Sequence, residues 1–115
     1  MKLSDIVMLR NGKFLPDNNR TGSYPIYGST GIIGYADKPL IENDAVVIGR
    51  VGAHCGTIQY ANGPSWITDN CIICTSTKNN LKYLYYLLQS KNLYELHSGS
   101  AQPLLTSKVI NNRYY

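Results

Sequence analysis

The chain has 115 residues, of which 43% are hydrophobic and 16% charged, and its formal net charge is +4 at pH 7. This length suits one domain, and the apolar fraction is enough for one core and excludes a disordered chain. No run approaches the roughly 20 apolar residues that cross a bilayer, and the start Met1-Lys2-Leu3-Ser4-Asp5 lacks the apolar stretch of a signal peptide. We therefore expect a cytoplasmic protein, in a prokaryotic cell or a virus-infected host, without membrane contact.

The charge balance bears on the kind of partner. There are 11 Lys and Arg residues against 7 Asp and Glu residues. A basic surplus favours polyanions, because cationic side chains that neutralise phosphates release counterions. The composition therefore directs attention to nucleic acid as a partner.

The first 76 residues predict short strands separated by turns. A strand-like segment at 6–9 is followed by a turn at Asn11-Gly12 and by a polar loop at 16–23. Glycines then punctuate the chain, and 45–50 and 57–60 are expected to form a hairpin. The remaining strand segments are expected at 24–27, 32–35 and 65–75.

The clearest helix is predicted over 80–90. Its leucines recur at i, i+3 and i+4 spacings on one face, and Asn79 or Asn80 can cap it. A second short helix is expected over 91–97, ending before Gly99. Strands first and helices later predict an α+β fold. We expect a small twisted, largely antiparallel sheet with hairpins, followed by a C-terminal helical segment whose leucine face packs on the sheet.

The three cysteines, Cys55, Cys71 and Cys74, are read as structural. An odd number in a cytoplasmic chain argues against a disulfide framework. The Cys71-Ile-Ile-Cys74 spacing suits a redox pair or half a zinc site, yet it lies in an apolar, β-prone run where residues three apart point to opposite faces. A second such pair is absent from the sequence, and His54 and His97 lack finger spacing. We expect Cys71 and Cys74 to be buried, reduced and metal-free.

Several motifs in a fixed order resemble a known family. They are Leu-Ser-Asp-Ile at 3–6 leading to Gly-Lys at 12–13, Tyr-Pro-Ile-Tyr-Gly-Ser-Thr-Gly-Ile-Ile-Gly-Tyr at 24–35, Val-Ile-Gly-Arg-Val-Gly-Ala-His-Cys-Gly at 47–56, Trp-Ile-Thr-Asp-Asn at 66–70, the helix at 84–88 and Gly-Ser-Ala-Gln-Pro at 99–103. In this order they resemble the target-recognition domain of type I restriction–modification specificity subunits.

The resemblance implies a twisted-sheet domain whose loops contact double-stranded DNA. In that family the domain reads half of a bipartite site, while separate subunits carry methylation and cleavage. We therefore expect residues 1–115 to form a single recognition domain that lacks the family's spacer helix and second domain. The implied partners are duplex DNA and the methyltransferase and restriction subunits; a homodimer stays open, and no cofactor is expected.

Loop residues are the expected DNA contacts. An arginine fork can hold a phosphate or a guanine edge, and hydroxyls and backbone N–H groups of a glycine turn can hold phosphate. Each has a structural alternative: Arg50 could pair with Asp44 or Asp69, the 28–31 segment could be a plain hairpin turn, and 66–70 is read as structural. The expected contacts are Lys13, Arg20, Ser29, Thr30, Arg50, His54 and Gln102.

Catalysis finds little support in the sequence. His54 and Cys55 are neighbours, but adjacent strand residues point apart, and neither paired carboxylates nor a phosphate-loop signature occurs. We expect a non-catalytic DNA-reading module. The rival is an interaction module or decoy that binds a methyltransferase or restriction subunit without reading DNA, and a third alternative is a truncated relic.

Overall fold

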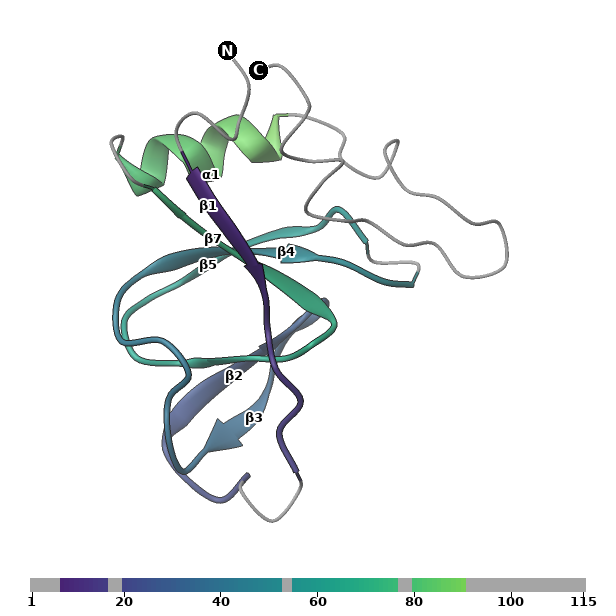
Figure 1. Ribbon diagram of the computed structural model, residues 1–115, viewed down its shortest axis with the longest axis vertical. Coiled ribbons are helices and arrows are strands. Elements are labelled where there is room, and N and C mark those ends of the chain that lie inside the picture. Colours follow the sequence, from purple (N-terminus) through teal and green to yellow (C-terminus); the bar gives the residue numbers. More distant parts are fainter. Residues whose placement is uncertain (1–6, 17–19, 53–54, 77–79, 91–115) are drawn as a thin grey trace.

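A computed structural model describes residues 7–16, 20–52, 55–76 and 80–90 of the chain. In it the chain forms strands followed by a helix (Figure 1). The elements are β1 (Val7–Asn11), β2 (Tyr24–Gly28), β3 (Gly31–Ala36), β4 (Ala45–Gly49), β5 (Ile58–Ala61), β6 (Trp66–Ile67), β7 (Cys71–Ser76) and α1 (Leu81–Gln89). In the described ranges, no helix is long and apolar enough to span a membrane.

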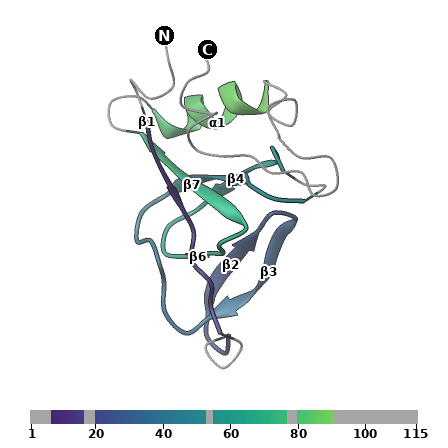
Figure 2. The ribbon, with the colours of Figure 1, turned by 45° about the vertical axis from the view of Figure 1, so that its right-hand side comes forward.

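The strands form two sheets rather than the single sheet that we expected. A four-stranded antiparallel sheet has the order β1-β7-β4-β5, and a three-stranded sheet has the order β3-β2-β6. β2 is antiparallel to β3 but parallel to β6. Figure 2 shows the four-stranded sheet between α1 above and the three-stranded sheet below. The expected α+β class and the antiparallel hairpins are therefore confirmed.

The layer order explains why the central strands have no polar face. In β4, Val46 and Ile48 face the cluster that includes α1, while Ala45 and Val47 face the cluster shared with the second sheet. All four side chains are fully buried. The sequence of a strand buried on both faces is continuously apolar, because the side chains on neither face contact water. The runs at 45–48 and 71–74 follow from this two-sided burial.

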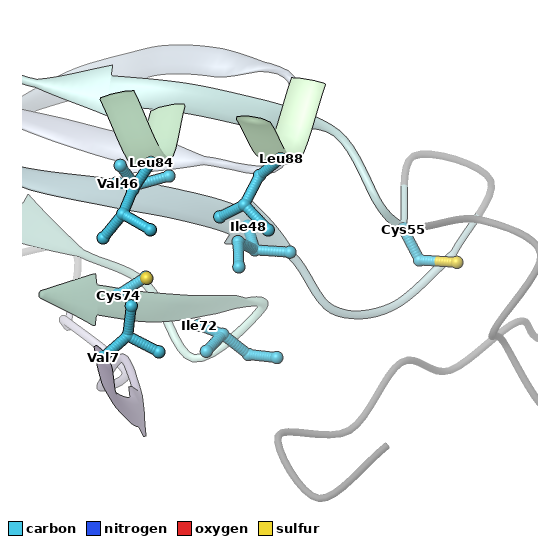
Figure 3. Packing of buried hydrophobic residues seen from close by; sticks show 8 residues of the cluster. All are labelled: Val7, Val46, Ile48, Cys55, Ile72, Cys74, Leu84 and Leu88. Atoms are coloured by element: carbon cyan, nitrogen blue, oxygen red, sulfur yellow. The ribbon is translucent and has the colours of Figure 1, made fainter. Parts of the chain in front are cut away.

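Helix α1 covers one face of the four-stranded sheet. The side chain of Asn80 caps it by accepting a hydrogen bond from the Lys82 N–H at 2.8 Å, which satisfies one of the free N–H groups of the first turn. Leu84 and Leu88 lie one turn apart and are fully buried among Val46, Ile48 and neighbouring side chains (Figure 3). The predicted packing of the leucine face on the sheet is confirmed.

The segment 65–75 is not the one strand that we predicted. It contains β6 and β7, which belong to different sheets, separated by a turn at 68–70. The polar residues Thr68, Asp69 and Asn70 lie between two apolar pairs, and there the chain reverses from one sheet into the other. The 45–50 and 57–60 hairpin is confirmed as β4–β5. The second helix expected over 91–97 lies outside the described residues.

The cysteines of β7 are positioned as the alternation predicted. Cys71 belongs to the cluster between the sheets and Cys74 to the cluster under α1, so the two thiols lie on opposite faces. All three cysteines are buried and free. Burial raises the pKa of Cys71 to about 11 and that of Cys74 to about 12. Both thiols are therefore neutral at physiological pH.

We predict that Leu84→Ala lowers the free energy of unfolding by about 2–5 kcal/mol, because it leaves a cavity against the sheet. Urea unfolding monitored by circular dichroism measures the change. Tyr83→Ala is the matched control, since Tyr83 lies on the same helix but is 58% exposed, and it should change stability by at most about 0.5 kcal/mol. Equal losses in the two variants would contradict the core assignment.

We predict that Cys74 makes stability fall at alkaline pH. In the unfolded chain the thiol ionises near its ordinary pKa of 9.0, while in the folded chain it stays protonated until about pH 12. The unfolded state therefore binds fewer protons across this interval, and the folded state loses stability as pH rises from about 9 toward 12.

The measurement compares urea unfolding under reducing conditions at pH 8 and pH 10. The wild-type protein should lose about 1 kcal/mol more than Cys74→Ala between these values, since other titrating groups contribute equally to both. Equal pH dependence in the two proteins would show that the Cys74 thiol is not buried as described.

Candidate functional site

Three chain connections meet at one end of the two sheets. The β4–β5 connection begins beside the β6–β7 turn, because Gly49 at the end of β4 pairs with Cys71 at the start of β7. Gly49 also donates its N–H to the Thr57 carbonyl at 2.9 Å, which joins the two ends of the β4–β5 connection. The β2–β3 turn approaches from the second sheet, and Figure 1 shows all three on the right-hand side. We call this group the loop cluster. It comprises 28–31, 50–52, 55–57 and 68–70.

Side chains of the β5 region bind the β2–β3 turn to the four-stranded sheet. The Thr57 hydroxyl donates to the Ser29 carbonyl at 2.9 Å, and the Gln59 amide donates to the Gly28 carbonyl at 2.6 Å. The Ser29 carbonyl lies in the two-residue loop, where it has no strand partner, and both bonds join the turn of one sheet to a segment of the other. The turn is thereby fixed, while the side chain of Thr30 stays exposed at its tip.

The β6–β7 turn is held from two sides. The Cys71 N–H donates to the Thr68 carbonyl at 3.1 Å, which makes Asp69 and Asn70 the central residues of a β-turn. The Arg50 N–H donates to the Asn70 carbonyl at 2.9 Å. The Arg50 guanidinium donates to the Asp69 carbonyl through Nε at 3.1 Å and Nη2 at 2.8 Å.

The hydrogen bonds of Arg50 agree in part with the structural alternative, in which Arg50 pairs with Asp44 or Asp69. Its guanidinium does bind Asp69, as the structural reading suggested, but through the main-chain oxygen and not the carboxylate. The other suggested partner, Asp44, accepts instead from the Tyr60 hydroxyl at 2.9 Å and from the Gly63 N–H. Burial, followed by the hydrogen bond to Asp44, raises the pKa of Tyr60.

The turn in the β4–β5 connection requires glycine. Gly52 and Gly56 have φ values of +78° and +88°, a left-handed region that residues with a Cβ resist. The Gly56 N–H returns to the Gly49 carbonyl at 2.8 Å. Cys55 is buried in this turn and not in a strand, so the strand argument against a His54–Cys55 pair does not apply. His54 itself lies outside the described residues.

Lys13 lies beside the loop cluster. Its N–H donates to the Ile67 carbonyl at 2.9 Å, and its carbonyl accepts from the Trp66 indole at 2.8 Å. A Cβ on the preceding Gly12 would overlap the Thr68 carbonyl oxygen, so only glycine permits this close approach. The backbone of Lys13 is structural, and its side chain is exposed.

Arg20 is not brought together with the other predicted contacts. It precedes β2, whereas Ser29 follows β2, so the two lie at opposite ends of the β2–β3 hairpin. The Arg20 guanidinium donates to the Leu15 carbonyl through Nε at 3.3 Å and Nη2 at 3.2 Å. Both predicted arginines thus hold a loop by a fork of hydrogen bonds to one carbonyl oxygen.

The structure therefore gathers Lys13, Ser29, Thr30 and Arg50 and separates Arg20 from them, while Gln102, like His54, lies outside the described residues. Sequence reasoning missed the exposed side chains of Asp69 and Asn70, which were read as structural. A signal was present, since three polar residues interrupt an otherwise apolar run at 66–74. Within the described ranges, no group of His, Cys, Asp or Glu residues could hold a metal ion.

Comparisons with known proteins identify a family. A family model described as the type I restriction modification DNA specificity domain matches residues 1–113. The chain is 29% identical over 108 residues to the type I restriction enzyme EcoprrI specificity subunit of Escherichia coli, covering 88% of this chain and 27% of that protein. The chain thus spans about a quarter of the length of this curated relative.

Solved structures share the fold. The S subunit of a type I restriction–modification system from M. genitalium superimposes with a TM-score of 0.85 at 16% identity, covering 98% of this chain and 32% of that one. The HsdS subunit from Thermoanaerobacter tengcongensis gives a TM-score of 0.64 at 18% identity, covering 98% and 31%. The two-sheet arrangement with its helix is therefore the fold of one region in each of these longer chains.

Proposed function

The chain belongs to the family of type I restriction modification DNA specificity domains, and from this premise we propose that it binds double-stranded DNA sequence-specifically through the loop cluster. The observation that carries the proposal is the family match over residues 1–113. We propose further that it acts as one non-catalytic recognition domain, which reads one half-site while other subunits carry methylation and cleavage. The methyltransferase and restriction subunits are then its protein partners.

The chemistry of the loop cluster suits a duplex. Phosphate contacts fix a protein on DNA, and base-edge contacts in a groove supply the sequence preference. The exposed Lys13 ammonium can neutralise a phosphate, and the Thr30 hydroxyl at the tip of the β2–β3 turn can donate to one. The turns that carry these groups are held by hydrogen bonds to both sheets, so little conformational entropy is lost on binding.

The helix α1 is assigned no DNA contact. Its leucine face is buried on the sheet, and Lys82 lies over the Tyr60 ring with Nζ 4.2 Å from the ring centroid. Arg20 supports the proposal less than Lys13 does, because it lies at the other end of the hairpin. His54 and Gln102 remain predicted contacts on the sequence alone.

We predict that residues 1–115 alone bind a duplex weakly, with dissociation constants of about 10⁻⁴–10⁻⁶ M at physiological salt, since one half-site reader tested by itself lacks the effective-concentration gain of two linked readers. Lys13→Ala should weaken binding to all sequences alike and reduce the slope of log K against log salt by about one unit. Fluorescence anisotropy on randomised duplexes over a salt series measures both quantities.

The matched control is Lys82→Ala, which removes the same charge from α1 and should leave the salt slope unchanged. Equal slope changes in both variants would indicate general charge attraction without a defined interface. An absence of duplex binding by the wild-type chain at low salt would refute DNA binding, and capture of a methyltransferase subunit by the same protein would then favour the interaction-module alternative.

A further inference from the structure

The β6–β7 turn is held by more hydrogen bonds than the reversal of the chain requires. One bond, from Cys71 N–H to the Thr68 carbonyl, closes the turn. Arg50 adds three more, by its backbone N–H and by its guanidinium fork, to the two carbonyls at the tip. Beneath the turn, Thr68 is buried and donates its N–H to the Tyr27 carbonyl at 3.1 Å. The backbone of the tip is therefore fixed relative to both sheets.

The two side chains at this fixed tip have no structural use among the described residues. Asp69 and Asn70 are exposed, and their side chains make no hydrogen bond within the described ranges. Asn70 contributes only its main-chain oxygen, to the Arg50 N–H. The turn is rigid, and the Asn70 amide at its tip has no partner among the described residues, so this amide is placed where a ligand can reach it.

We infer that Asn70 is a specificity-determining residue that reads a base, and that Arg50 is the positioning residue that holds it. The inference rests on the proposed function. A carboxamide offers a donor and an acceptor side by side, which matches the N6 and N7 edge of adenine in the major groove. The preferred base opposite Asn70 is therefore adenine.

Arg50 is the less suitable reader, although its residue type favours guanine. Of the five N–H groups of the guanidinium, those of Nε and Nη2 are directed to the Asp69 carbonyl, and this pair of bonds fixes the orientation of the side chain. Turning the guanidinium toward a base would break these bonds and free the turn. We therefore assign Arg50 the positioning role and Asn70 the base contact.

The neighbouring carboxylate favours a groove position for the turn. Asp69 would be repelled by a phosphate at close range, whereas in the major groove a carboxylate can accept from the cytosine amino group. Among the described residues, the cations next to the turn are Lys13 and Arg50. This distribution of charge suits contact of Lys13 with the phosphate backbone of DNA and contact of the turn with base edges.

The test of Asn70 compares base preferences of the 115-residue chain on a randomised duplex library. Asn70→Ala should reduce discrimination at one base position by about 5- to 150-fold and leave the salt slope unchanged. Asn62→Ala is the matched control, because Asn62 is also exposed but follows β5 at the opposite end of the sheet. It should leave all base preferences unchanged.

The test of Arg50 asks whether it acts through Asn70. Arg50→Lys keeps the charge but loses the fork, so it should relax preference at the same base position with an unchanged salt slope. The same change in an Asn70→Ala background should relax it no further. Arg10→Lys, at an exposed position on β1, is the control and should have no effect.

The outcomes separate this inference from the proposed function. Wild-type binding with a base preference that Asn70→Ala leaves intact would overturn the inference and retain DNA binding. A uniform loss of affinity with a smaller salt slope in Asn70→Ala or Arg50→Lys would identify a phosphate contact and also overturn it. No duplex binding by the wild-type chain would overturn both. If Asn70→Ala fails to fold, Asn70→Leu, which keeps the size of the side chain without adding charge but loses its donor and acceptor, decides the question in the same assay.

Discussion

Burial of β4 on both faces is the constraint on which the rest of the structure depends. Val46 and Ile48 pack under α1, and Ala45 and Val47 pack toward the second sheet, so both faces of this strand are covered only when both layers are present. Each larger apolar side chain buried in this way contributes roughly 1.5–3 kcal/mol. A one-residue slip of register would exchange the two faces and place each side chain in the wrong layer. The register of β4 is therefore closely fixed.

The loop cluster follows from that fixed register. Because β4 ends at Gly49 opposite Cys71, the β4–β5 connection and the β6–β7 turn must lie side by side. Bonds from Thr57 and Gln59 then attach the β2–β3 turn of the other sheet to the same place. The loop cluster is thus assembled at the ends of strands, among which β4 is apolar along its whole length. Binding groups on such loops are positioned by a rigid scaffold, as is common for recognition surfaces.

Much of the fold could be predicted from local pattern. The spacing of apolar residues along the sequence predicted β1, the β2–β3 and β4–β5 hairpins and the helix, because strands and helices differ in this spacing. The division into two sheets could not be predicted in this way. It depends on which strands pair across long separations, such as β1 with β7, and on a parallel contact between β2 and β6. The polar turn at 68–70 was the one local sign of the change of sheet.

The candidate site was only partly accessible from sequence. Residue chemistry pointed to Arg50, yet it could not reveal that the guanidinium is used on the Asp69 carbonyl, since a backbone oxygen leaves no sequence signal. It also grouped Arg20 with Ser29, which the hairpin places at opposite ends. Asn70 was predicted to be structural, because the side chain of an Asn at a turn commonly bonds the local backbone. Its exposure and the hydrogen bonds that fix its backbone are visible only in three dimensions.

The central claim is that duplex DNA binds at the loop cluster, and amide chemical-shift mapping by NMR tests it most directly. Titration of the full chain with a duplex containing its preferred site should perturb the amides of 28–31, 50–52 and 68–70 and leave those of Leu84 and Leu88 in α1 unchanged. Perturbations concentrated on α1, or none at concentrations well above 10⁻⁴ M, the weak end of about 10⁻⁴–10⁻⁶ M expected for non-specific binding, would contradict the account.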